Sequence, residues 1–534
     1  MSSETFAAPK ALNQTDVYAV HGADPEVLAY AMARYSRSAL SMRESLAEIG
    51  AQRAEQVLNT FYFQYGHRSI ADLAHVAFAV ERLSLLAAIV LVDEERWDGQ
   101  ERSTRYQNFM KSGWYLPDFG TVTASARLYS ETVDGLFAAY QRTSAAVLEL
   151  LKRRVQRPEA LKPEAYERTL KARAFDVARY LLPLATNTSL GQIVNARTLE
   201  TQVSRLLSHP AAEVRDLGMK LRNAAACPAW NVGAQAGKAF VDSLAALGTE
   251  AAKSLSEEAA QLLTREVKTA PTLVKYAQAN EYLMRSREEL KQAAAEALVG
   301  AECGGSEPVV DLVERTECLE VEMAATLLYS ASHISYRRIR DLVADWPQAR
   351  VVEIVELGLR HRGKHDEALR AFKAGAALRF DILMDIGGFR DMHRHRRCVQ
   401  ILQEFTSEHG YETPGAGDLG GDADILAEAG IEADYRGAVE GAHRAGAQIA
   451  AGAAPESAQS AQYVLPLATR IRALFKMDWA EAQYISELRT GPAGHFSYRR
   501  VAWEMYTALE RQHPALARHI RVTDFRQPID MLQR

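Results

Sequence analysis

The hydrophobic and polar positions of this 534-residue chain repeat mostly with the period of a helix. Apolar residues recur three and four positions apart, Ala, Leu, Glu and Arg dominate, and alternating runs of β-branched residues are rare. Short segments near Phe78, near Phe380 and at 351–355 have the composition of strands. The longest apolar run, 83–92, is too short to cross a membrane and predicts a buried helix. The pattern therefore predicts a helix-rich α+β fold.

One stretch of the chain occurs twice. Residues 180–186, Tyr-Leu-Leu-Pro-Leu-Ala-Thr, return 283 positions later as Tyr-Val-Leu-Pro-Leu-Ala-Thr at 463–469. Upstream of the two copies stand Gly66-His67 and Gly363-Lys364-His365. A match of this length indicates two tandem copies of one domain. The Gly, Ser and Pro residues near 300–308 mark the best boundary. We expect a first domain, a helical connector and a second domain at 1–247, 248–306 and 307–534.

Composition and charge exclude several classes of protein. A chain of this length that is 48% hydrophobic can form two or more domains. Its formal net charge of −5 argues against a nucleic-acid partner bound through the phosphate backbone. The four cysteines form no Cys-x-x-Cys pair, which fits a reducing compartment. The first residues lack the pattern of a secretory signal. We expect a cytoplasmic protein without a membrane partner.

The segment 389–398 concentrates positive charge around Asp391, with Arg394, His395 and Arg396 in a row. Neighbouring cations repel one another unless an anion or a ligand lies between them. Arginine forks fit a phosphate or a flavin carbonyl edge, and histidine donates or accepts a hydrogen bond near neutral pH. A solvated basic face is the alternative. A second segment, Glu101-Arg-Ser-Thr-Arg-Tyr106, favours a binding site.

These motifs resemble the flavin-dependent thymidylate synthase (ThyX) family. The family signature is Arg-His-Arg-x-x-Ser-x-x-x-x-Ser-x-Arg-Tyr, with Gly-His-x-Ser upstream and Leu-Pro, Asn-x-Arg and Leu-x-Leu-Arg downstream. The first half of the chain matches four of these elements, at Gly66–Ser69, Ser103–Tyr106, Leu182-Pro183 and Asn195–Arg197. It has Asp93-Glu94-Glu95 in place of Arg-His-Arg.

The second half has the opposite losses. It keeps Arg394-His395-Arg396, Leu465-Pro466 and Glu487-Leu488-Arg489. The Ser-x-Arg-Tyr element falls on Glu404-Phe-Thr-Ser407, and the Asn-x-Arg element falls on Asp478-Trp-Ala480. Because the losses are complementary, we expect one composite site, to which the first half supplies Glu101, Ser103 and Arg105, and the second half supplies Arg394 and Arg489.

The resemblance implies an enzyme that binds FAD and methylates dUMP at C5 to give dTMP. Methylenetetrahydrofolate would supply the carbon, and NADPH would reduce the flavin. Family members form homotetramers whose sites combine residues of several subunits, so a homodimer of this tandem chain would mimic the family assembly.

The resemblance also implies residue roles. Arg394, Ser103 and Arg105 would be catalytic, and Arg394 beside the pyrimidine carbonyls would stabilise an enolate-like state. The substrate would be bound by Glu101, Ser103, Arg105, Arg394 and Arg489. The flavin would contact His67, Ser69, Asn195, Arg197, His395 and Arg396.

Simpler interpretations exist for several of these motifs. Asn195 and Arg197 could be a helix cap or a surface pair, and His67 could be a loop histidine that satisfies a backbone carbonyl. Ser69 could cap a helix, with Asp72 completing a capping box. The acidic triplet 93–95 could be a solvated helix end, or it could pair with the basic residues 394–397.

Three other functions are left open by the sequence. Asp391, His393 and His395, with His361 and His365 nearby, have the residue types of a metal site in a hydrolase, although the flanking arginines disfavour a cation, and no metal is expected. Since neither half is intact, the protein could be a non-catalytic flavin- or nucleotide-binding paralogue. A third possibility is C5 methylation of another pyrimidine nucleotide, because Asp391 stands where the family often has Gln, beside the uracil edge.

Overall fold

The computed structural model describes most of the chain, at residues 20, 22–34, 41–48, 68–301, 308–313, 319–361, 369–372, 378–415, 418–419, 424–454, 456–517, 520–527 and 530–532. It contains two compact units. The smaller unit comprises Met1–Val76, Asn195–Arg197 and Ala224–Lys275, and the larger unit comprises Ala77–Val194, Thr198–Asn223 and Tyr276–Arg534. Each of these units combines separate segments of the chain, whereas the predicted domains are consecutive stretches with boundaries at 247 and 306. The predicted boundaries stay a prediction.

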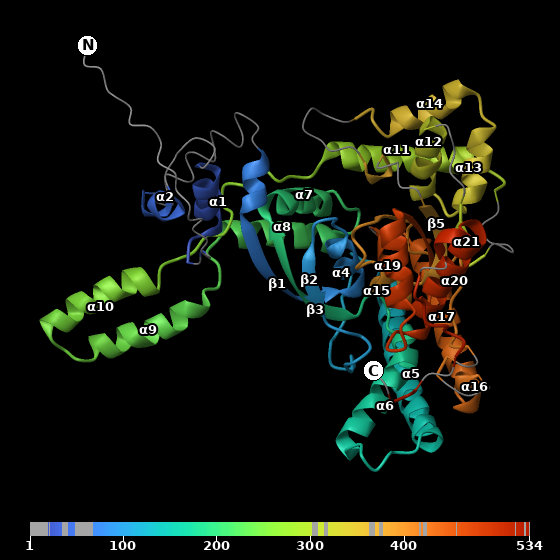
Figure 1. Cartoon of the computed structure of the whole chain (residues 1–534), viewed down its shortest axis with the longest axis horizontal. Helices are drawn as coiled ribbons and strands as arrows, with labels where there is room; N and C mark the ends of the chain where they lie inside the picture. The colour runs from blue at the N-terminus through green and yellow to red at the C-terminus, as the bar shows by residue number, and fades with distance from the viewer. Residues whose placement is uncertain are drawn as a thin grey trace. The chain divides into compact units, whose positions relative to one another are not determined.

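The smaller unit is helical. Its elements are α1 (Pro25–Arg34), α2 (Met42–Glu48), the 3-10 helix η2 (Arg68–Leu73), α9 (Val232–Ala245) and α10 (Glu250–Leu263). Helices α9 and α10 lie side by side as a hairpin (Figure 1). Each begins at a polar residue that accepts a backbone N–H of its first turn, Asn231 for α9 and Thr249 for α10. The buried carboxylate of Glu26 accepts the N–H groups of Thr272 and Leu273 at 2.9 and 2.8 Å.

The larger unit contains the remaining described elements, except for a few end residues of β1, β3, α7 and α8 that belong to the smaller unit. The strands are β1 (His75–Ser84), β2 (Asp98–Glu101), β3 (Asn187–Asn195), β4 (Val310–Leu312), β5 (Leu378–Asp385), β6 (Val399–Leu402) and β7 (Arg470–Met477). The helices of its first half are α4 (Leu85–Val92), α5 (Thr123–Arg154), α6 (Pro163–Ala178), η3 (Arg179–Leu181), α7 (Ala196–Leu207) and α8 (Ala212–Ala226). The later helices are α11 (Glu281–Ala297), α12 (Leu319–Ser330), α13 (Tyr336–Ala344), α14 (Gln348–Leu357), η4 (Arg370–Phe372), α15 (Ile386–Met392), α16 (Ile425–Glu428), α17 (Glu432–Ala450), α18 (Ser457–Gln462), α19 (Trp479–Arg489), α20 (Phe496–Gln512) and α21 (Pro514–Ala517).

Two small sheets organise the larger unit. The strand orders are β1-β3-β2 and β4-β5-β7-β6, and in the second sheet all neighbouring pairs are antiparallel. The predicted strands near Phe78 and Phe380 are confirmed as β1 and β5. The predicted helix in 83–92 is confirmed as α4 (Leu85–Val92). Its N-cap is Ser84, whose hydroxyl accepts the Ala87 N–H at 2.9 Å.

The predicted strand at 351–355 is wrong, because these residues lie in α14. The buried side chains of this segment are Val351 and Ile354, three positions apart, which is the spacing of a helical face. Both belong to a hydrophobic core that α14 shares with α11, α12 and α13. Burial on this face outweighs the strand preference of the β-branched residues. None of the helices in the described part of the chain is long and apolar enough to cross a membrane.

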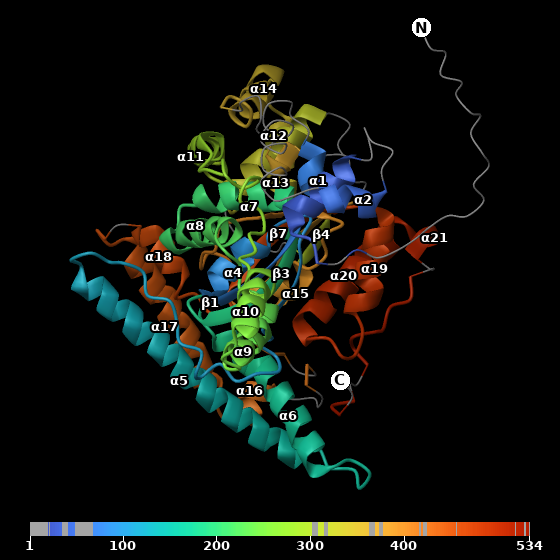
Figure 2. The same cartoon turned by 90° about the vertical axis from the view of Figure 1, so that its left-hand side faces the viewer.

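The two halves repeat one order of elements. In each half a strand leads into a short helix, a second strand, a long helix, the Leu-Pro segment, a third strand and a further helix. This order reads β1-α4-β2-α5-β3-α7 in the first half and β5-α15-β6-α17-β7-α19 in the second. The repetition bears out the predicted helix-rich α+β tandem fold. The equivalent long helices α5 and α17 lie side by side in both views (Figures 1 and 2).

The two Leu-Pro segments meet through reciprocal backbone hydrogen bonds. The N–H of Leu184 donates to the carbonyl of Leu465 at 2.9 Å, and the N–H of Leu467 donates to the carbonyl of Leu182 at 3.0 Å. Ala185 and Ala468 repeat the exchange with Tyr463 and Tyr180. The same surface of each copy therefore faces the other, as in an isologous dimer interface.

This reciprocity predicts matched costs for equivalent substitutions. Leu184 and Leu467 are both fully buried, so Leu184→Ala and Leu467→Ala should each lower the free energy of unfolding by about 2–5 kcal/mol. Leu116, which is 52% exposed, provides the control Leu116→Ala, expected to change stability by less than about 0.5 kcal/mol. Thermal and urea unfolding followed by circular dichroism would measure all three. If either buried variant behaves like Leu116→Ala, the two segments are not equivalent parts of the interface.

Candidate functional site

Arginines from both halves of the chain gather around Asp391 of α15. Arg179 donates from Nη1 to Oδ2 of Asp391 at 3.1 Å. Burial alone would raise the pKa of Asp391, but four arginines lower it to about 2: Arg179, Arg105, Arg394 and Arg489. Asp391 is therefore ionised at neutral pH and lies where the first and second halves both contribute positive charge.

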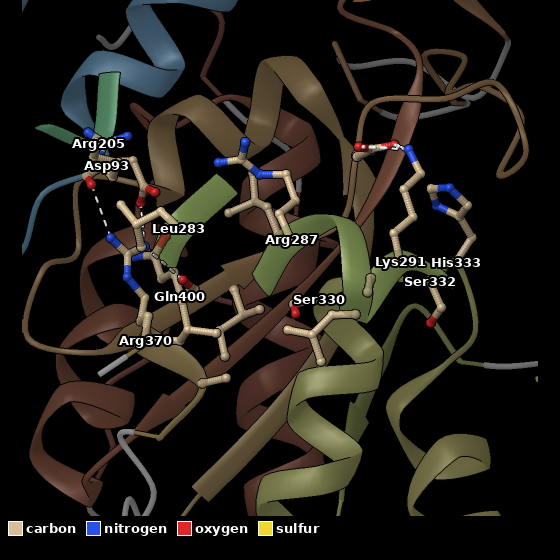
Figure 3. Close-up of a pocket in the computed structure, with 17 residues that line it drawn as sticks. Asp93, Arg205, Leu283, Arg287, Lys291, Ser330, Ser332, His333, Arg370 and Gln400 are labelled. Carbon is tan, nitrogen blue, oxygen red and sulfur yellow. Dashed lines mark hydrogen bonds and ion pairs between the residues drawn. The ribbon is translucent and has the colours of Figure 1, made fainter. Parts of the chain in front are cut away.

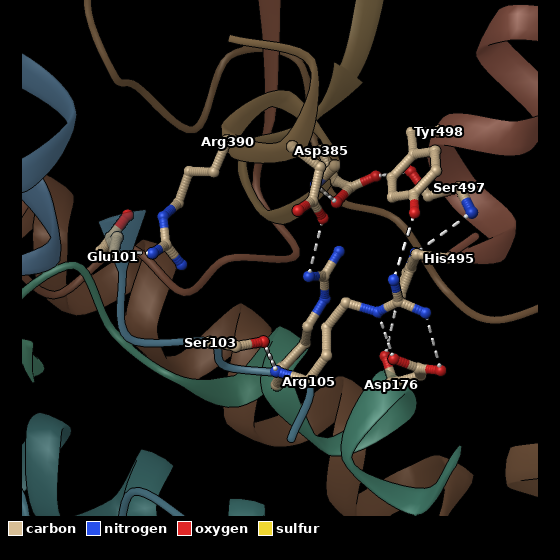
Figure 4. A network of polar contacts seen from close by, with 12 residues as sticks. Glu101, Ser103, Arg105, Asp176, Asp385, Arg390, His495, Ser497 and Tyr498 are labelled. Atoms are coloured by element: carbon tan, nitrogen blue, oxygen red, sulfur yellow. Dashed lines mark hydrogen bonds and ion pairs between the residues drawn. The ribbon is translucent and has the colours of Figure 1, made fainter. Parts of the chain in front are cut away.

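Arg105 is the buried link between the halves. Its Nε donates to Oδ1 of Asp176 at 2.7 Å, on α6 of the first half. On the second half, Nη1 donates to the hydroxyl of Tyr498 at 3.1 Å and Nη2 to the carbonyl of Ala493 at 3.3 Å. Figure 4 shows Arg105 between Asp176 and Tyr498. The guanidinium is thus held in one orientation by groups from both copies.

Arg489 is oriented by a buried histidine. Its Nε donates to Nε2 of His395 at 2.7 Å, and Glu481 lies 3.4 Å from Nδ1 of the same ring. Because arginine only donates, Nε2 must accept and the ring proton belongs on Nδ1. Burial lowers the pKa of His395, opposed by Glu481 and reinforced by Arg489. The guanidinium of Arg489 also lies 5.4 Å from the centroid of the Tyr498 ring, within the range of a cation–π contact.

The other two cations of the basic triplet differ in exposure. Arg394 is exposed and makes no hydrogen bond or ion pair with any residue that the structure describes. Arg396 is half-buried, with its guanidinium 4.5 Å over the ring of Trp97 from the first half. Its Nε is buried without a hydrogen-bond partner among the described residues. Both arginines therefore keep donors that a ligand could use.

Two further predicted residues lie on the first half. Glu101 ends β2 and forms an ion pair with Arg390 of α15, so this contact also joins the halves (Figure 4). The hydroxyl of Ser103 accepts the backbone N–H of Arg105 at 3.2 Å. The structure thus brings Glu101, Arg105 and the basic triplet into one region of the larger unit.

Arg179 belongs to the cluster although no sequence motif predicts it as a site residue. This side chain is 1% exposed, and its Nε and Nη2 have no hydrogen-bond partner in the part of the chain that the structure describes. A signal existed in the repeat, because Arg179 directly precedes one copy of the Tyr-x-Leu-Pro segment and Gln462 precedes the other. A charge present in only one copy of a duplicated segment marks a place where the copies differ in function.

Asp385 and Ser497 are two further residues of this region that no sequence motif predicts. Asp385 precedes α15 and accepts the N–H of Gly388, and the Ser497 hydroxyl donates to the same carboxylate. Burial raises the pKa of Asp385 to about 6, with Arg179 acting in the opposite direction. This pair fixes the start of the helix that carries Asp391 and Arg390.

Four predicted flavin contacts belong to the first half of the sequence. His67 and the side chain of Ser69 lie outside the described residues, so the choice between a flavin contact and a helix cap for Ser69 stays open. Asn195 and Arg197 belong to the smaller unit, where Arg197 pairs with Asp72 at 3.2 Å. The grouping of these four residues with Arg394 stays a prediction.

The acidic triplet is not a solvated helix end. Asp93 pairs with Arg370 at 2.5 Å and with His393 at 3.1 Å, both from the second half, and Glu94 pairs with Arg205 at 2.8 Å. Burial would raise the pKa of Asp93, but Arg370 and His393 lower it. The predicted pairing with residues 394–397 is not found in these contacts, because the partners of Asp93 and Glu94 are Arg370, His393 and Arg205.

The described histidines considered for a metal site have other partners: His393 contacts Asp93, and His395 contacts Arg489. His361 lies 2.6 Å from Glu289, and His365 lies outside the described residues. Within the described ranges, no three His, Cys, Asp or Glu side chains gather as a metal ion would require.

Comparison with known proteins identifies the family. The model of the family described as thymidylate synthase complementing protein matches residues 19–228 and 312–515. A UPF0159 protein of Chlamydia muridarum is 29% identical over 94% of this chain and 91% of its own, and one of Chlamydia pneumoniae is 27% identical over 96% and 92%. The solved flavin-dependent thymidylate synthase ThyX of Helicobacter pylori, complexed with FAD and dUMP, aligns with 38% of this chain and 89% of its own at 16% identity and a TM-score of 0.25. Because the family model matches two separate segments that together span most of the sequence, the chain belongs to the thymidylate synthase complementing protein family as a divergent tandem member.

Proposed function

We propose that the protein is an FAD-dependent enzyme of the thymidylate synthase type. It would carry out the reductive C5 methylation of dUMP to dTMP, with methylenetetrahydrofolate as carbon donor and NADPH as reductant. The observation that supports this function best is the convergence of Arg105 and Arg179 from the first half with Arg394 and Arg489 from the second around Asp391. Each half alone carries part of the family signature, and the charges meet between the halves.

The charge balance of the cluster favours a nucleotide phosphate. Asp176 pairs with Arg105 and Asp391 pairs with Arg179. The charges of Arg394 and Arg489 are left, and two arginines suit a phosphate dianion, which accepts from guanidinium forks. The Ser103 hydroxyl lies beside Arg105 and could add a donor.

Arg105 would act mainly by position. Its contacts join the two halves, because Asp176 belongs to the first half and Tyr498 and Ala493 belong to the second. The ring of Tyr498 also lies close to the guanidinium of Arg489. Loss of Arg105 would leave Asp176 buried without its partner, which is strongly destabilising for a buried pair. The side chain thereby sets where Arg489 stands relative to the first half.

The donors of the second half fit a flavin. The half-buried Arg396 has an Nε without a described partner and could donate to a flavin carbonyl. FAD, when bound, would supply the hydride chemistry of the reaction. Both ring nitrogens of His395 are engaged, by Arg489 and Glu481, so His395 would hold Arg489 in place beside the cofactor.

A cytoplasmic homodimer is the assembly that we propose. Two tandem chains would provide four family domains, the number in the family homotetramer that the sequence resembles. The reciprocal Leu-Pro contact between the two copies of one chain supports this pairing.

A second candidate function is C5 methylation of another pyrimidine nucleotide. Asp391 is ionised at neutral pH, and an ionised carboxylate only accepts hydrogen bonds. Such a group beside the base edge favours a base that presents donors, such as the amino group of cytosine. The choice between uracil and cytosine nucleotides therefore depends on whether Asp391 faces the base or serves Arg179 alone.

The composite site predicts that both halves are required. Arg105→Ala and Arg394→Ala should each lower kcat/KM for dUMP methylation at least about 100-fold, since a buried or substrate-bound charge pair is worth several kcal/mol. Arg397→Ala is the matched control, because Arg397 belongs to the same basic run but is exposed and lies no closer than 3.8 Å to a carboxylate. Tritium release from C5 of labelled dUMP would measure turnover.

Mixing the two inactive variants separates two arrangements of the halves. Because Arg105 and Arg394 act on the same Asp391 within one chain, a mixture of Arg105→Ala and Arg394→Ala chains should stay inactive. Recovery of turnover in the mixture would instead place the working site between chains. Full turnover by either variant alone would remove the composite site altogether.

Asp391→Asn tests the base that the site accepts. The amide keeps the shape of the carboxylate and can donate as well as accept, so it should favour uracil over cytosine nucleotides. If Asp391 faces the base, the ratio of kcat/KM for dCMP to that for dUMP should fall at least about 10-fold, the effect of one mismatched buried hydrogen bond. An unchanged ratio would assign Asp391 to Arg179 alone.

A further inference from the structure

The larger unit contains a cavity whose lining includes no residue of the arginine cluster around Asp391. Its volume is about 360 Å³, and its lining comes from both halves (Figure 3). Leu290 and Ile401, which belong to the hydrophobic core of the second half, line part of it. Charged side chains, among them Asp93, Arg205, Arg287, Lys291, Arg370 and Glu404, line another part. This size and mixture of surfaces suit a small organic ligand with a charged group.

The cavity lies at the counterpart of the candidate site. Two of its lining residues are Asp93 and Glu404. In the alignment of the halves, Asp93 stands where the second half has Arg394, and Glu404 stands where the first half has Ser103. The pseudo-symmetry of the fold thus creates this second position, and substitution has changed its chemistry.

Three of its cations are matched by carboxylates. Arg370 pairs with Asp93 at 2.5 Å, and Lys291 pairs with Glu404 at 3.0 Å. Arg205 pairs with Glu94 at 2.8 Å. These pairs leave no surplus charge of either sign.

Arg287 is the exception. It lies in the wall of the cavity on α11 and donates from Nη1 to the backbone carbonyl of Ser208 at 2.8 Å. No carboxylate of the described residues is within ion-pair distance of it. Burial lowers the pKa of Arg287, and the positive charge of Arg205 acts in the same direction. Glu404, which is already paired with Lys291, and Glu288 act in the opposite direction, but neither forms an ion pair with Arg287.

The pKa of the neighbouring His209 is affected by the same positive charges. Burial lowers the pKa of His209 to about 3, and the charges of Arg287, Arg205 and Arg215 contribute. Half-buried positive charge without a matching carboxylate is unfavourable unless an anion neutralises it. The carbonyl of Ser208 uses one arm of the Arg287 fork, which leaves other N–H donors beside the cavity.

We propose that this cavity is a second anion-binding site, which takes a phosphomonoester about the size of a nucleotide. The phosphate accepts hydrogen bonds from Arg287 and lies close to Arg205, and the organic part packs on Leu290 and Ile401. A phosphate is favoured over a carboxylate because its three terminal oxygens can accept from more than one guanidinium. The proposal concerns binding and does not depend on whether the protein methylates dUMP.

Direct binding measurements on the full chain test the site. Inorganic phosphate and dTMP serve as probes in equilibrium dialysis. Arg287→Gln should weaken the binding of both probes to this site at least about 10-fold, the effect of losing one charge-assisted hydrogen bond. Arg287→Lys, which keeps the charge, should weaken it less. Arg285→Gln is the control, since Arg285 lies on the same helix but is exposed and pairs with Glu281 at 3.1 Å.

Binding at this cavity must be distinguished from binding at the cluster around Asp391. In an Arg394→Ala chain the site at Arg287 should remain, and adding Arg287→Gln to that chain should remove it. Equal binding of phosphate and dTMP by wild type and Arg287→Gln would overturn the proposal. So would complete loss of binding in Arg394→Ala alone. If Arg287→Gln does not fold, the same comparison is made with Arg287→Lys, whose binding must then differ from that of Arg285→Gln.

Discussion

The contact on which the rest of the larger unit depends is the exchange of backbone hydrogen bonds between the two Leu-Pro segments. Leu184 donates to Leu465 and Leu467 donates to Leu182, so each copy of the segment pairs with the other in the same way. Backbone groups buried at such a junction must be satisfied, and here each copy satisfies the other. This constraint fixes the two domains about a local pseudo-twofold relation and brings residues that are almost 300 positions apart into contact.

A pseudo-twofold relation creates two equivalent positions, and the residues that line them carry opposite charges at Arg394 and Asp93. At one position Arg394, Arg489 and Arg105 meet around Asp391. At the other, Asp93 replaces the first cation of the triplet and pairs with Arg370 and His393. The two positions therefore share the fold of the repeat but differ in the charge of equivalent side chains. Duplication therefore leaves room for two roles, the proposed nucleotide chemistry at one position and the proposed binding of a phosphomonoester at the other.

Local pattern and the repeat were enough to predict much of the fold. The apolar run that became α4, the strands at Phe78 and Phe380 and the tandem arrangement all follow from periodicity or self-similarity. The segment 351–355 was misjudged, because its β-branched residues favour a strand while burial on one face selects a helix. The partners of Asp93 and the place of Arg179 depend on contacts between the halves, and no local pattern encodes such contacts. The surplus charge of Arg287 becomes visible only when the pairs around it are known.

The central claim is that two incomplete halves build one flavin and nucleotide site in each chain. The most direct measurement is the visible absorption spectrum of the purified protein, with FAD content determined per chain and the oxidised flavin titrated with dUMP. We predict one FAD per chain and a change in the flavin spectrum when dUMP binds. Two FAD per chain would show that each half forms its own site, and a colourless protein that cannot be loaded with FAD would contradict the flavin-dependent function.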